Sequence, residues 1–326
     1  RCRMTIELVH WLVLEQTFAL FNISTDEWSL QRVLVMFMPA IGGLLLIPLW
    51  ILFPKDLKGG FSSFLVKVNL RGAKLHFRPL FTKGLASAIT LGTGGSAGQE
   101  GPIAVIGGTI GSQFGKSFRM SNDRIKVLVA CGAAAGVAAT FNAPIAGVFF
   151  ATEIVLLSSY GLSSFTSIVI ASGMATVVSR ALLGDVSEIV APPYVMGSLW
   201  ELGFYVLLGI LIGGLAAGFI DLHYRIKDRI DALKLPPLSK PFLGGLAVGV
   251  IGIGLPQVFG NGYEFISEVL VGHHSWYLLG LLVIAKMVAT SITLGSGMPG
   301  GLFAPCLFLG AVFGGAYGHL LEVLFP

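Results

Sequence analysis

Long apolar runs separated by short polar connections dominate the sequence. A helix needs roughly 20 predominantly apolar residues to cross a bilayer, and several runs approach or exceed that length. They cover residues 4–22, 33–53, 125–157, 162–183, 197–223, 240–258 and 276–294, and the run at 125–157 is interrupted. The pattern therefore predicts an all-α integral membrane protein.

Composition supports a membrane location. The chain is 54% hydrophobic and 12% charged, and its mean hydropathy is +0.83. A soluble domain usually has about 25% charged residues, so this chain has too little charge to coat a soluble fold. Its 44 glycines suit close helix packing in lipid, where small residues let backbones approach one another.

The net charge of +4 does not indicate a nucleic-acid partner, because the basic residues lie in short connections instead of one patch. The segment 223–240 separates two apolar runs and contains five basic residues. They are Arg225, Lys227, Arg229, Lys234 and Lys240. This segment is expected to be a cytoplasmic connection.

The residue types that carry catalysis or bind metals are sparse. Three cysteines make no disulfide framework, and six histidines show no ligand spacing. The pairs Ser62-Ser63 and His273-His274 lack the partners of a nucleophile or a metal site. Neither an enzyme nor a cofactor is expected.

One stretch of the chain occurs twice. Residues 83–115 match residues 286–318 at a constant offset of 203, with 12 of 33 positions identical. Each copy is an apolar run, a glycine-rich break and a second apolar run. A proline followed by two glycines precedes each copy at an offset of 202: Pro39, Gly42, Gly43 and Pro241, Gly244, Gly245. Paired interrupted segments in two halves of a membrane protein point to a transport site.

The repeat divides the chain into two halves, 4–184 and 197–326. Shifting the end of the first half by 203 residues places the end of the second half near residue 387. The chain ends at Pro326, so the second half is expected to be incomplete here.

A helix broken inside a membrane exposes backbone groups, which is tolerable where they line a polar cavity or meet a ligand. A glycine-rich turn that opens a helix presents free N–H groups and the positive end of the helix dipole, and both attract anions. Glu100 lies in the first break, and its counterpart in the second copy is Phe303. Its carboxylate is either a helix-dipole partner or a tethered anion that competes with the substrate.

These motifs resemble the CLC family of chloride channels and chloride/proton antiporters. The GQEGP segment is similar to the family's GREGP, with Gln99 in place of arginine, and GSGMPGGLFAP looks like its GxFxP element. The segment 132–153 also matches. The selectivity motifs comprise Gly98, Gln99, Glu100, Gly101 and Pro102, and Gly301, Leu302, Phe303, Ala304 and Pro305.

The resemblance implies an inverted-topology repeat with broken, tilted helices, and a homodimer with one anion pathway per subunit. It implies that Glu100 is the gating glutamate. The backbone amides that it assigns to chloride binding belong to Gly101, Leu302, Phe303 and Ala304. Lys83 falls where the family has a buried lysine that raises the pore potential, and its alternative role is an interfacial lysine.

The chain departs from the family pattern in three places. The serine of the GSGIP element has no clear counterpart, and Ser62 or Ser63 is the candidate for an inner chloride site. Glu153 matches the first inner acid, but Ile154 replaces the acid that relays protons, which resembles the channel-type pattern. The family's pore tyrosine and any nucleotide-binding tail would lie beyond Pro326.

The expected function is transport of chloride through a glutamate-gated pore that is channel-like or weakly proton-coupled. One alternative is a chloride/proton antiporter with a non-standard proton path, and another is a cation-coupled secondary transporter. The expected partners are chloride, protons and the lipid of a plasma (inner) membrane, with no nucleic acid.

Overall fold

The computed structural model describes residues 30–157, 162–185, 189, 192–193, 196, 198–272 and 274–324. The apolar run at 4–22 and His273 lie outside these residues. The helices of the first half are α3 Leu30–Leu45, α4 Ile47–Leu52, α5 Pro54–Leu57, α6 Gly60–Leu70, α7 Arg78–Gly92, α8 Glu100–Ser117, α9 Asn122–Phe141, α10 Pro144–Phe149, the π-helix η2 Phe150–Val155 and α11 Leu162–Leu183.

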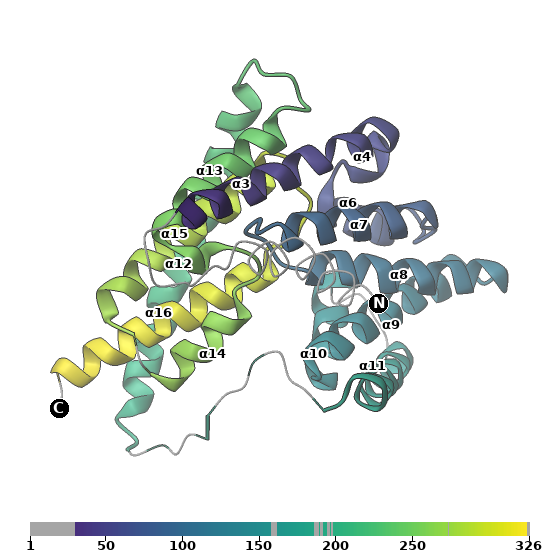
Figure 1. Cartoon of the computed structure of the whole chain (residues 1–326). Coiled ribbons are helices and arrows are strands. Elements are labelled where there is room, and N and C mark those ends of the chain that lie inside the picture. The colour runs from purple at the N-terminus through teal and green to yellow at the C-terminus, as the bar shows by residue number, and fades with distance from the viewer. Residues whose placement is uncertain are drawn as a thin grey trace.

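The second half continues the helical pattern, in agreement with the all-α prediction. Its helices are α12 Glu201–Ala232, α13 Lys240–Gly254, the short 3-10 helix η3 Pro256–Val258, α14 Tyr263–Val271, α15 Trp276–Gly295 and α16 Phe303–Leu324. Figure 1 shows α6 to α11 on one side of the molecule and α12 to α16 on the other. The first-half helix α3 lies along α13.

Six helical segments of the described chain are long and apolar enough to cross a membrane. They are Val35–Leu52, Asn122–Phe141, Ser164–Leu183, Glu201–Ala232, Trp276–Gly295 and Phe303–Leu324. The predicted runs at 162–183 and 276–294 agree with α11 and α15 to within one residue. The predicted run at 33–53 is divided near Leu46 into α3 and α4.

The predicted connection at 223–240 begins as a helix, because α12 continues through its first ten residues to Ala232. These residues include no proline or glycine, and an ion pair between Arg225 and Asp221 at 2.6 Å links adjacent turns. At about 1.5 Å per residue, a helix of 32 residues is about 48 Å long, which exceeds the roughly 30 Å apolar layer of a bilayer. The polar end of α12 is therefore long enough to extend beyond that layer.

The interruption predicted within 125–157 falls between α9 and α10. Asn142 ends α9 with a left-handed backbone (φ 56°), and Pro144 begins α10. Asparagine tolerates this conformation at a helix end, and proline suits the first turn of the next helix because its missing N–H would be unpaired there. The local sequence thus explains the break.

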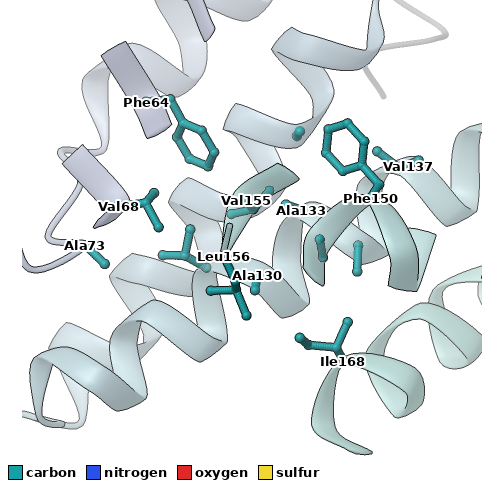
Figure 2. Packing of buried hydrophobic residues seen from close by; sticks show 14 of the residues in the cluster. Phe64, Val68, Ala73, Ala130, Ala133, Val137, Phe150, Val155, Leu156 and Ile168 are labelled. Atoms are coloured by element: carbon teal, nitrogen blue, oxygen red, sulfur yellow. The ribbon is translucent and has the colours of Figure 1, made fainter. Parts of the chain in front are cut away.

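The packing around α9 forms the larger core of the first half (Figure 2). Phe64 on α6 and Phe150 on η2 face buried residues of α9, and Ile168 on α11 closes the cluster. Helix α8 approaches α9 so closely that a methyl group on Gly107 would overlap the backbone of Gly132. This close packing fixes α8, and therefore the break that precedes it.

Candidate functional site

The two glycine-rich breaks have the same form. The first separates α7 from α8, and the second separates α15 from α16. Gly94 and Gly297 occupy equivalent positions in the repeat, and both have left-handed backbones, with φ of 87° and 94°. The backbone therefore turns in the same way in both breaks, before the second helix of each copy begins.

Gly98 and Gly301 join the two breaks directly. The N–H of Gly98 donates to the carbonyl of Gly301 at 2.7 Å, and the N–H of Gly301 donates to the carbonyl of Gly98 at 2.8 Å. These residues also occupy equivalent positions at the offset of 203. Mutual pairing of equivalent residues is the contact expected across a two-fold axis, so the breaks meet as two halves of one site.

Four helices of the described chain begin around this pairing. They are α8 at Glu100, α16 at Phe303, α6 at Gly60 and α14 at Tyr263. Gly101 lies against Gly301 and the side chain of Phe61, which brings the start of α6 to the break. Each N-terminus contributes unpaired N–H groups and the positive end of a dipole. The site can therefore attract an anion without a full positive charge.

Glu100 places its own carboxylate among these helix ends. Its side chain is 1% exposed. The backbone N–H of Ala304 donates to Oε2 at 3.3 Å, and the hydroxyl of Tyr263 donates to Oε1. The carboxylate at the start of α8 thus binds a backbone N–H at the N-terminus of α16 and the side-chain hydroxyl of the first residue of α14, both in the other half of the chain. The contact with α16 is the one that the tethered-anion alternative requires.

Tyr263 was not singled out from the sequence. It is 3% exposed, and its ring meets Phe141 edge-on with 5.8 Å between centroids. Phe141 also contacts Phe303, at 5.8 Å between centroids. The available signal was the repeat: Gly59 and Gly262 are equivalent left-handed residues before α6 and α14, so Tyr263 begins the counterpart of α6.

The remaining residues of the two selectivity motifs lie at the starts of α8 and α16. Gln99, Gly101 and Pro102 are buried in the first copy. In the second copy, Ala304 and Pro305 are buried, Leu302 is exposed and Phe303 is half-buried. The structure thus brings both motifs together around the Gly98–Gly301 pairing.

Ser62 and Ser63, the candidates for an inner hydroxyl, lie in the first turn of α6. Ser62 is exposed, and the hydroxyl of Ser63 donates to the carbonyl of Gly60 at 3.1 Å within its own helix. The half-buried Lys83 donates from Nζ to the same carbonyl at 3.0 Å. Lys83 therefore contacts the start of α6, and the Ser63 hydroxyl is oriented by its own turn.

Glu153, the candidate inner acid, lies on the π-helix η2. Both Glu153 and its neighbour Ile154 are exposed. They lie on the segment that follows the break at Pro144, and the first residue of that segment, Phe150, contacts Phe303 of the second motif, with 6.1 Å between ring centroids.

Lys286 is the counterpart of Lys83 in the repeat, at the offset of 203. It is fully buried, and its Nζ donates to the carbonyls of Val258 and Gly260, both at 3.0 Å. The Gly260 carbonyl also accepts from the N–H of Ala97 at 3.3 Å. Lys286 therefore ties the loop before α14 to the first break.

A family of known proteins has a sequence model that matches most of this chain. Residues 42–326 match the family model described as voltage gated chloride channel. The chain belongs to this family. The predicted resemblance is confirmed, and family membership places the chain among multi-pass membrane channels and transporters, which are not enzymes.

Two curated members of the voltage gated chloride channel family illustrate the similarity. The chain is 39% identical over 261 residues to the chloride channel protein CLC-f of Arabidopsis thaliana, a match that covers 75% of this chain and 33% of that protein. It is 37% identical over 271 residues to the H(+)/Cl(-) exchange transporter ClcA of Vibrio parahaemolyticus, covering 79% and 58%. The matches thus span between a third and two thirds of these relatives.

A solved structure of the family supports the fold. The crystal structure of a slow cyanobacterial Cl-/H+ antiporter superimposes with a TM-score of 0.85 and 26% sequence identity. The superposition covers 100% of this chain and 76% of that one. The predicted CLC-type fold is therefore confirmed.

Proposed function

We propose that this protein transports chloride or a similar small anion across a membrane, and that Glu100 gates the pathway. The observation that carries the proposal is the contact between the Glu100 carboxylate and the N–H of Ala304 at the start of α16. A helix N-terminus that holds a carboxylate can hold a halide through the same N–H groups. Glu100 and the transported anion would therefore compete for one position.

The proposed cycle needs no change in the helices. Ionised Glu100 blocks the anion position at the start of α16 by occupying it. Protonation removes its charge, and a neutral carboxyl binds the N–H donors more weakly than a carboxylate does. The side chain then swings aside and chloride takes its place. Helix dipoles suit conduction because they bind the anion weakly enough to release it.

The proposed coupling to protons is weak or absent. Ile154 stands where family antiporters carry an acid that relays protons, and its side chain has no group to bind a proton. The second candidate is a chloride/proton antiporter with another proton path. It is favoured by the ClcA relative and by the antiporter of similar structure.

We propose further that the protein is a homodimer in a plasma (inner) membrane. Lys83 would raise the electrostatic potential at the start of α6.

Chloride efflux from liposomes tests the gate. Glu100→Ala should give a flux that no longer depends on external pH, because the competing carboxylate is gone. Glu264→Ala is the matched control, since Glu264 is an exposed acid in the first turn of α14. Unchanged pH dependence in Glu100→Ala would refute the gating role. Uptake driven by sodium in the absence of chloride would instead establish the cation-coupled transporter.

A further inference from the structure

The hydroxyl of Tyr263 contacts the carboxyl group of Glu100 from a different helix than Ala304 does. Tyr263 is the first residue of α14, and its hydroxyl donates to Oε1, whereas the Ala304 N–H binds Oε2. The second half of the chain therefore supplies one donor to each oxygen of the carboxyl group. Chloride is a single atom, so a chloride in the position of Oε2 would receive the Ala304 N–H without needing the tyrosine.

This difference favours the carboxylate over chloride in their competition for the site. A hydrogen bond to a charged group shifts an equilibrium by about tenfold or more. The bond is also stronger to a carboxylate than to a neutral carboxyl, so it favours the ionised, blocking form. We propose that Tyr263 is a latch: a positioning residue whose hydroxyl holds Glu100 in the blocking position and sets the pH at which the pathway opens.

The surroundings of Tyr263 keep the hydroxyl in place. Its ring is buried against Phe141, which limits its rotation. Gly262, before it, has a left-handed backbone (φ 82°), and a methyl group there would lie 3.4 Å from the Nζ of Lys286. Lys286 fixes the carbonyls of the same loop. Phe141 thus restrains the ring of Tyr263, and Lys286 restrains the loop that precedes its backbone.

Ionisable side chains also lie on α7, α15 and α16. Lys286 on α15 is bound to the carbonyls of Val258 and Gly260, and Lys83 on α7 is bound to the carbonyl of Gly60. Cys306 on α16 is exposed. Among the described residues, Tyr263 is the ionisable side chain with a hydrogen bond to the Glu100 carboxyl group. The latch therefore consists of one hydrogen bond, between the Tyr263 hydroxyl and the Glu100 carboxyl group.

The latch rests on the proposed gating role of Glu100, and a four-variant experiment separates the two. Chloride efflux from liposomes is measured against external pH for the wild type, Tyr263→Phe, Glu100→Ala and the double variant. Tyr263→Phe should raise the pH of half-maximal flux by about one unit and raise flux at neutral pH about tenfold. In the Glu100→Ala background, the same substitution should have no further effect on the pH profile.

Each outcome bears on one of the proposals. An unchanged midpoint in Tyr263→Phe overturns the latch, and a further pH shift in the double variant also overturns it, because the tyrosine would then act without Glu100. Persistent pH dependence in Glu100→Ala overturns the gate itself. Tyr317→Phe is the control for loss of a tyrosine hydroxyl bond, since the half-buried Tyr317 donates from its hydroxyl to the carbonyl of Phe204 at 3.0 Å elsewhere in the fold. It should leave the pH profile unchanged.

Discussion

Gly245 on α13 lies directly against the backbone of Pro39 on α3, with no space for a side chain between them. The same contact occurs in reverse, because Gly43 on α3 lies against the backbone of Pro241 on α13. These four residues are the proline and second glycine of the paired motifs at the offset of 202. The two halves therefore hold one another through a reciprocal contact.

This contact predicts a strong effect of a small substitution. Gly245→Ala should lower the free energy of unfolding by about 1–3 kcal/mol, because the new methyl group overlaps the Pro39 backbone and the helices must separate. Gly254→Ala in the same helix is the control, since the space around Gly254 is open. Thermal unfolding in detergent measures both variants. Equal stability of the two would show that α3 and α13 are not packed in this way.

Lys286→Met should destabilise the protein more than Lys83→Met. The first substitution removes the lysine donor from the carbonyls of Val258 and Gly260. Gly260 keeps the N–H of Ala97, whereas the buried Val258 carbonyl loses its lysine donor, and a buried carbonyl left without a partner costs about 1–3 kcal/mol. Lys83 donates to one carbonyl and is only half-buried. Thermal unfolding and chloride flux are measured together, because a displaced loop before α14 should also reduce transport. A larger loss in Lys83→Met would contradict this account.

Chloride should stabilise Glu100→Ala more than the wild type. In the wild type the carboxylate occupies the Ala304 N–H, so added chloride must displace it before binding. The variant leaves that donor available. A ligand that binds only the folded state at 100 times its dissociation constant adds about 2.7 kcal/mol of stability. Unfolding temperatures in chloride and in gluconate give the comparison, and equal chloride effects in both proteins would argue against a shared position.

Proton movement should distinguish the two candidate modes of transport. Chloride efflux from liposomes through the wild type should cause little or no proton uptake, because Ile154 cannot relay a proton. Ile154→Glu should introduce measurable uptake, since it places a second acid beside Glu153. Val169→Glu, at an exposed position on α11, controls for the added charge. Stoichiometric uptake by the wild type would establish the antiporter.

The sequence predicted the helices that end at glycine, proline or a clear change in polarity. It located the break at Pro144 and both breaks of the repeat for this reason. It does not show where α12 ends, because charged residues such as Arg225 and Lys227 end the apolar run although they are good helix formers. Loss of hydrophobicity marks the end of an apolar layer, whereas a helix continues until its backbone is interrupted.

The candidate site could be predicted in its parts but not in its contacts. Glu100 was conspicuous as an acid within an apolar region. Its hydrogen bond to Tyr263 joins residues 163 positions apart, and it depends on how α14 meets α8, which no local pattern specifies. Lys286 is identical to its repeat counterpart Lys83, but its complete burial follows from the packing of α15 and not from that identity.

The paired hydrogen bonds between Gly98 and Gly301 also restrict the mechanics of the molecule. A carrier that rocks its two halves apart around a central site would have to break both bonds in every cycle. Here the halves are fastened together at the place where an ion would pass, so the surrounding framework is best suited to remain stationary. The moving part would then be a single side chain. The rate of anion passage would be set by rotations about its bonds and not by the motion of whole domains.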